Sequence, residues 1–97
     1  MAKSEKYDWI VGVGGTDVDG VKMHRFHGTV HQAKQHLVNL VDIDRTNNQD
    51  YFEYGTEKIK EVETRTHNES LYAYGCYSDY HIDYEATRLD KLIERKN

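Results

Sequence analysis

Residues 29–42 have the sequence TVHQAKQHLVNLVD, which is the clearest structural signal in the chain. Thr29 is a favourable helix N-cap, and Gln32 three residues later completes a capping box. The apolar residues of the stretch share one stripe at helical spacing: Val30, Ala33, Leu37, Leu40 and Val41. We therefore expect an amphipathic helix that ends near residues 44–46, with this stripe packed on a sheet.

Two alternating segments precede this helix. Residues 7–13 place Trp9, Val11 and Val13 on one face, and residues 21–27 alternate between a face that begins with Val21 and Met23 and a second face, which is typical of strands. Between them, Asp19-Gly20 is a strong hairpin signal. We expect two antiparallel strands here, with Gly14 and Gly15 in the connecting turn.

The second half of the chain predicts more of the same sheet. Residues 58–66 alternate with few apolar positions, which indicates a charge-guarded edge strand. Residues 71–77 form the next strand, and residues 80–84 continue the extended pattern. Residues 51–56 suit a short helical turn or an irregular segment, and residues 88–95 have the spacing of a short C-terminal helix. The predicted fold class is α+β, an antiparallel sheet in ββαββ order with one main helix on one face, to which residues 80–84 could add a final strand before the short helix.

Length and composition restrict the class of protein. Ninety-seven residues make one domain, residues 1–97, with residues 1–6 as a flexible N-terminal tail. The net charge of -4 disfavours direct nucleic-acid binding and suits a partner protein with a basic surface. A single cysteine rules out an intrachain disulfide and a cysteine-based zinc framework. No segment is long and apolar enough for a signal or membrane span, so we expect a cytoplasmic location without membrane contact.

Residues 71–85 hold five of the eight tyrosines of the chain, interspersed with carboxylates. A domain this small cannot bury five phenol rings and satisfy every hydroxyl, and tyrosine is enriched in recognition surfaces. One alternative is that some of these rings fill the core, and another is that they form cross-strand pairs that stabilise the sheet. We expect a partner-binding strip whose members are Tyr72, Tyr74, Tyr77, Asp79, Tyr80, Asp83, Tyr84 and Glu85.

No motif in the chain predicts catalysis, a metal site or an organic cofactor. The glycines of residues 12–15 lack the spacing of a phosphate loop, and the acidic turn at residues 17–20 does not match an EF-hand. His24 and His27 lie on opposite faces of a strand and cannot readily share an ion. Ser78, Asp79 and His81 supply triad letters, but neighbours on a strand do not converge. An enzyme that uses Cys76 and His81 remains the alternative function, beside a self-associating module such as a homodimer.

The segments Leu71-Tyr72-Ala73-Tyr74-Gly75-Cys76 and Asp79-Tyr80-His81-Ile82-Asp83-Tyr84 look like a family signature. With small size, acidic balance, an α+β pattern and no enzyme motif, the chain resembles anti-defence proteins encoded by phages and mobile elements, anti-CRISPR proteins among them. The resemblance implies a non-enzymatic inhibitor that binds a host CRISPR-type nuclease and blocks it. The modest charge favours a blocker that binds protein over a mimic of DNA.

Overall fold

The computed structural model describes residues 5–15, 20–47, 52–55, 59, 62–65, 70–77 and 80–92. In these ranges the elements are β1 (Tyr7–Gly15), β2 (Lys22–Gly28), α1 (Val30–Asn47), β3 (Phe52–Gly55), β4 (Glu63–Arg65), β5 (Ser70–Tyr77), β6 (Tyr80–Arg88) and α2 (Leu89–Leu92). The fold is α+β, as predicted. Within the described residues no helix is long and apolar enough to cross a membrane.

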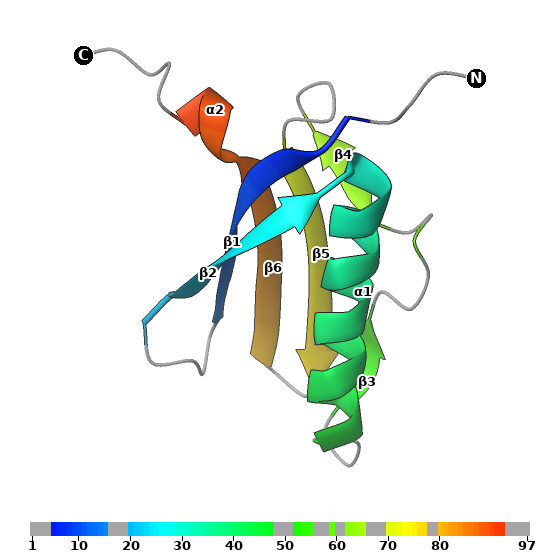
Figure 1. The fold of residues 1–97 in the computed structure, drawn as a ribbon. Coiled ribbons are helices and arrows are strands. Elements are labelled where there is room, and N and C mark those ends of the chain that lie inside the picture. Colours follow the sequence, from blue (N-terminus) through cyan, green and yellow to red (C-terminus); the bar gives the residue numbers. More distant parts are fainter. Residues whose placement is uncertain are drawn as a thin grey trace.

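All strands belong to one antiparallel sheet in the order β2-β1-β6-β5-β3. β3 and β4 share the outer edge of β5, because β3 pairs with residues 75–77 and β4 with residues 70–72. α1 connects β2 to β3 and crosses one face of the sheet (Figure 1). The middle strands β1 and β6 are paired over seven residues each, from Trp9 opposite Arg88 to Gly15 opposite Ile82.

The core lies between α1 and the sheet. The predicted capping box is present: the Gln32 amide nitrogen donates to Thr29 Oγ1 at 3.1 Å, and the Thr29 amide nitrogen donates to Gln32 Oε1 at 2.9 Å. Of the predicted stripe, Ala33, Leu37 and Val41 are buried, whereas Val30 and Leu40 are partly buried. The sheet contributes these buried side chains to the same core: Trp9, Val11, Leu71, Ala73, Ile82, Tyr84 and Ala86.

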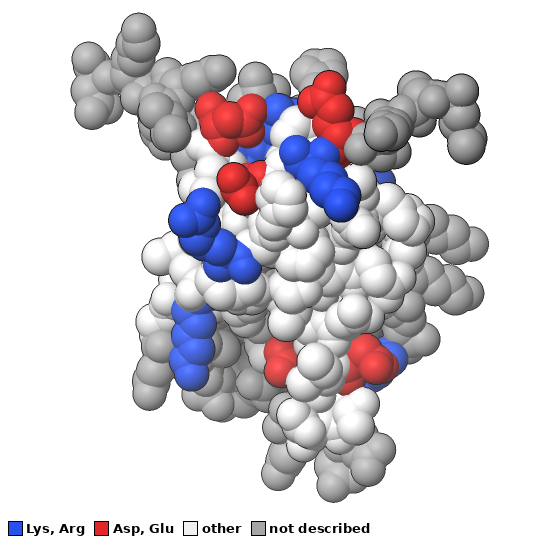
Figure 2. Space-filling view, in the orientation of Figure 1, with Lys and Arg blue, Asp and Glu red and all other residues white. Residues whose placement is uncertain are grey.

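On the face of the molecule seen in Figure 2, the charged side chains lie mainly at the periphery. Figure 2 shows, in the orientation of Figure 1, that Lys, Arg, Asp and Glu side chains gather around the edge and leave the middle largely uncharged. At the end of β6 the Arg88 guanidinium contacts Asp90, whose carboxylate accepts two hydrogen bonds at 3.1 and 2.7 Å. The same guanidinium lies 3.7 Å from the ring centre of Tyr7, so it fastens the end of β6 to the start of β1.

The predicted ββαββ order is wrong in the second half of the chain. In the described ranges four strands follow α1 rather than two, because residues 52–55 form β3 and the extended residues at 80–88 form a separate final strand, β6. Each local pattern was too short or too polar to reveal this, and pairing with β5 supplies the backbone hydrogen bonds that define both strands. Arg88, expected to begin a helix, ends β6, and the single turn of α2 follows it.

Of the edge strand predicted over residues 58–66, the described residues show β4, which is three residues long. A turn precedes it, in which the Val62 amide nitrogen donates to the Ile59 carbonyl oxygen at 3.1 Å. A regular strand over residues 58–66 would place Ile59 and Val62 on opposite faces. The turn instead lets both contribute to the core, with Val62 buried and Ile59 partly buried.

Gly14 and Gly15, expected in the hairpin turn, belong to β1 and pair with Asp83 and Ile82 of β6. A Cβ atom built at Gly15 would lie 2.1 Å from the His81 carbonyl oxygen, far inside any real contact. Glycine is therefore required at this position by the close approach of β6. The turn itself contains Gly20, whose φ of 69° is in the left-handed region that favours glycine.

Candidate functional site

The face of the sheet opposite α1 is the candidate site. Side chains alternate along each strand, so the neighbours of the buried residues point away from the helix. The uncovered face is thus built from alternate positions of β2, β1, β6 and β5. From these strands it presents Met23 and Arg25, then Ile10 and Gly12, then Asp83, Glu85 and Thr87, and finally Tyr72 and Tyr74.

Tyr72 and Tyr74 lie on this face as the strip hypothesis expected. Their ring centres are 6.3 Å apart with an interplanar angle of 21°, so the rings stack loosely along β5. Tyr74 is 41% exposed, whereas Tyr72 is half-buried. The alternative in which these two tyrosines fill the core is wrong, because Leu71 and Ala73 occupy the core positions of β5.

Asp83 and Glu85 of β6 stand beside these rings. Strand register places Tyr72 opposite Glu85, and Tyr74 opposite Asp83. Asp83 is already engaged, because the Tyr72 hydroxyl donates to its Oδ1 and His81 Nε2 lies 3.3 Å from its Oδ2. Glu85 is exposed and has no ion-pair or hydrogen-bond partner among the described residues. The face therefore offers one carboxylate that is held in place and one that can take a new partner.

Tyr84 is a core residue, which corrects its assignment to the binding strip. Its side chain is fully buried, and its hydroxyl donates to Asp44 Oδ2 of α1 at 2.5 Å. The hydrogen bond satisfies the phenol where the ring fills the space between helix and sheet. Asp79 lies outside the described residues. Tyr77 and Tyr80 pair across the β5–β6 hairpin, but their side chains also lie outside what the structure describes.

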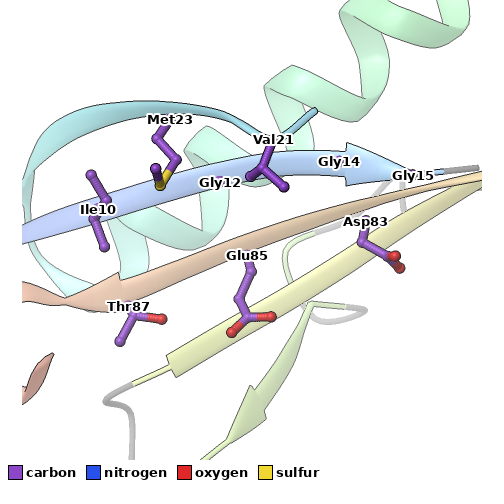
Figure 3. A pocket seen from close by; sticks show the side chains of 9 residues that line it. All are labelled: Ile10, Gly12, Gly14, Gly15, Val21, Met23, Asp83, Glu85 and Thr87. Carbon is purple, nitrogen blue, oxygen red and sulfur yellow. The ribbon is translucent and has the colours of Figure 1, made fainter. Parts of the chain in front are cut away.

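A hollow of about 400 Å³ opens on the uncovered face, next to the acidic pair. Its floor is the backbone of β1 at Gly12 and Gly14, which carry no side chains of their own and lie next to Val21. Figure 3 shows Asp83 and Glu85 on one side of the hollow and Val21 and Met23 on the other. These two apolar side chains are 65% and 67% exposed, which is unusual for residues of their size.

The hollow was missed by sequence reasoning, which treated these glycines as turn residues. The available signal was the spacing of Gly12 and Gly14, two residues apart and in phase with Met23 on the neighbouring alternating segment. In a strand, glycines two residues apart lie on the same face, so they leave two successive positions of that face without side chains. Recognising this required knowing that β1 extends to Gly15.

The described histidines make several contacts, none of which assembles a metal centre or a triad among the described residues. Within those residues no three His, Cys, Asp or Glu side chains converge. The backbone register places Cys76 opposite His81, while the Ser78 and Asp79 of the triad letters lie outside the described residues.

His24 and His27 face opposite sides of β2, as expected: His27 Nδ1 contacts Asp8 at 3.0 Å, and His24 Nε2 lies 2.7 Å from His36 Nε2 of α1. The contact between His24 and His36 was not foreseen. The His36 ring also stacks on Phe26, with ring centres 4.4 Å apart. Burial and the neighbouring His24 lower the pKa of His36. The pair therefore joins β2 to α1 through one neutral ring that accepts and one that donates.

Comparisons with protein-family models, with curated proteins and with solved structures found no match to this chain.

Proposed function

We propose that this protein is a non-enzymatic inhibitor that holds a basic region of a larger protein against the uncovered face of its sheet. The observation that carries the proposal is the gathering of Tyr72, Tyr74, Asp83 and Glu85 on that face, opposite α1. The resemblance to anti-defence proteins suggests the class of target, a nucleic-acid-processing defence enzyme such as a CRISPR-type nuclease.

The tyrosines supply contact area at low cost. An aromatic ring has two side-chain torsions to fix, and stacking already restricts both Tyr72 and Tyr74 before a partner arrives. Truncation of such a ring at the centre of an interface typically costs 2 kcal/mol or more, about a 30-fold loss of affinity. Two pre-ordered rings on an uncovered face are thus suited to anchor a protein partner.

The carboxylates select a basic partner. Glu85 has no described partner, so an arginine or lysine that approaches the face gains a charge-assisted hydrogen bond without breaking one here. Basic side chains that hold phosphate groups in a nuclease have this chemistry. Occupying them with a carboxylate would block nucleic-acid binding without any covalent step. The net charge of -4 adds attraction over a longer range.

A plasmid-interference assay tests the inhibition. Cells that carry a CRISPR-type nuclease receive a targeted plasmid together with the wild-type protein, the double variant Tyr74→Ala/Glu85→Lys, or Asp42→Lys. Asp42 lies on α1, so its charge reversal is matched in sign and lies on the other side of the sheet. We expect the plasmid to survive with wild type and with Asp42→Lys, and to be lost with the double variant.

The binding step is measured separately from inhibition. Immobilised wild type, Asp42→Lys and the double variant are incubated with lysate of such cells, and the retained nuclease is quantified against purified standards. Retention by the first two and loss from the double variant, by at least about 30-fold, is the expected result. Equal retention by all three variants would remove the uncovered face as the interface. Equal cleavage of the plasmid with all three would remove the nuclease as the target.

A further inference from the structure

We infer that the hollow above Gly12 and Gly14 takes one arginine side chain of the partner; this inference rests on the proposed function and specifies what the face binds. The arginine stem would lie against Val21 and Met23, and its guanidinium would reach Glu85.

Two parallel rows of side chains cross the uncovered face with the same order of chemistry. The first runs from Met23 on β2 through Gly12 on β1 and Glu85 on β6 to Tyr72 on β5. This row is therefore apolar on β2, without a side chain on β1, acidic on β6 and aromatic on β5.

The second row has the same order. It runs from Val21 through Gly14 and Asp83 to Tyr74. Because both glycines leave the same strand bare, the two gaps adjoin along β1 and form the hollow (Figure 3).

The width of the hollow suits a single side chain. Neighbouring strands are about 4.8 Å apart, so the apolar side chains of the β2 side and the carboxylates of β6 stand on backbones roughly 10 Å apart. After their own thickness is subtracted, one layer of atoms fits between them. A Cβ atom at Gly12 would meet only Val21 and Met23, at the ordinary contact distances of 3.6 and 3.8 Å, so these two side chains form the near wall of the hollow.

The lining matches a side chain that is apolar along its length and cationic at its end. Val21 and Met23 are exposed, and covering them with methylene groups removes apolar surface from water. The opposite wall carries Glu85, whose carboxylate would be left without water or partner if an uncharged group filled the hollow. A neutral apolar ligand is therefore disfavoured.

Arginine fits these walls better than lysine. Its planar guanidinium is weakly hydrated, pairs with a carboxylate through two parallel hydrogen bonds and stacks on aromatic rings. Tyr72 stands next to Glu85 in the same row and offers such a ring. Asp83 already accepts from Tyr72 and faces His81, so Glu85 is the carboxylate that the guanidinium would engage.

The experiment is an NMR titration of the isotope-labelled protein with the capped tripeptide acetyl-Gly-Arg-Gly-amide. A single side chain on a flexible peptide is expected to bind weakly, at about millimolar concentration, so the peptide is added to several times that concentration. We expect saturable shifts of the Gly12, Gly14 and Glu85 amide signals. The matched peptide with citrulline, which has nearly the same shape and no charge, should bind at least about tenfold more weakly, and the lysine peptide should lie between them.

Filling the hollow supplies the second measurement. Gly12→Val places a β-branched side chain, which strands accommodate well, into the space that the stem would take. Gly12→Ala does the same with a single methyl group whose contacts are ordinary. Binding of the arginine peptide should fall at least tenfold in Gly12→Val and less in Gly12→Ala, while Ile43→Ala on the far side of α1 leaves it unchanged.

The outcomes separate this inference from the proposed function. If the arginine peptide shifts Tyr72, Tyr74 and Glu85 equally in wild type and Gly12→Val, arginine binds the face outside the hollow, and only the inference fails. Equal binding of the citrulline peptide would overturn the choice of a cation. Absence of any saturable shift would overturn the arginine site, whereas the proposed interface stands or falls with the retention experiment on Tyr74→Ala/Glu85→Lys.

Discussion

Along β6, the side chains of Tyr84 and Ala86 are fully buried beneath α1, whereas Asp83 and Glu85 point to the other side of the same strand. On the covered side the Tyr84 hydroxyl is satisfied by Asp44 of the helix, and Trp9 and aliphatic side chains fill the rest of the core. On the uncovered side, β1 lies next to Asp83 and Glu85 and has no side chain at Gly12.

The two faces of the sheet therefore have different physical requirements. The covered face must exclude water and leave no buried polar group unpaired, and among the described residues no buried side-chain nitrogen or oxygen lacks a partner. The uncovered face contributes little to the exclusion of water from the core. It can therefore hold a carboxylate such as Glu85 without a described partner. This comparison predicts large stability effects on one side and binding effects on the other.

The largest expected effect is on the covered face. Leu37→Ala removes a fully buried side chain from the centre of the helix stripe and should lower the free energy of unfolding by about 2–5 kcal/mol. Ile43→Ala is the matched control, because Ile43 is on the same helix and 55% exposed. Urea denaturation followed by circular dichroism measures both. A loss in Leu37→Ala no greater than in Ile43→Ala would show that α1 does not pack as described.

The glycines of β1 give the next contrast. Gly15→Ala would bring a Cβ atom to within 2.1 Å of the His81 carbonyl oxygen, so the strands must shift, at a cost of about 1–3 kcal/mol. Gly12→Ala meets no such obstacle and should be neutral or stabilising by about 0.4–1 kcal/mol, because alanine restricts the unfolded chain. Thermal unfolding of the two variants decides this. Equal melting temperatures would contradict the close approach of β1 and β6.

A smaller effect is expected from pH, at the contact between β2 and α1. Burial, and secondly His24, lower the pKa of His36 in the folded protein, so the unfolded chain binds a proton at this residue more readily. Stability should therefore be full above the ordinary histidine pKa of about 6.5 and fall as the pH drops below it.

Two variants isolate this contribution. In His36→Gln the fall in melting temperature between about pH 7.5 and 5.5 should be reduced, since the group that takes up the proton is gone. His31→Gln removes a histidine from the exposed side of the same helix and should leave the pH profile as in wild type. If His31→Gln flattened the profile as much as His36→Gln, the effect would not come from the contact of His36 with His24 and Phe26.

Much of the covered face could be predicted from the sequence because its signals are local. The helix stripe and the capping box at Thr29 and Gln32 depend on spacing within a few residues, and both are present. The strand pairings after α1 could not be predicted in the same way. β3 is four residues long, and its partner β5 lies about twenty residues further on, so its existence depends on a distant edge.

The uncovered face was predicted in part for the same reason. Tyr72, Tyr74, Asp83 and Glu85 belong to one dense stretch, and composition alone marked them as a candidate surface. Composition could not tell that Tyr84 points the other way, because that depends on which of two alternating sets the helix covers. Nor could it show the hollow, which needs β1, β2 and β6 in register.

The smallest effect on stability is expected at the residue with the largest expected effect on binding. Glu85→Lys reverses an exposed charge that has no described partner, so the free energy of unfolding should change by no more than about 0.5 kcal/mol. Asp42→Lys, which breaks an exposed contact with Arg45 at 3.0 Å, should change it by a similar amount. Urea denaturation measures both. A loss above about 2 kcal/mol in Glu85→Lys alone would place this carboxylate among the structural residues, because only a buried or paired charge is that costly to replace. Reduced partner binding by the variant would then be a consequence of a damaged fold. The contrast between a structural covered face and a binding uncovered face would fail at Glu85, the residue for which it makes its clearest prediction.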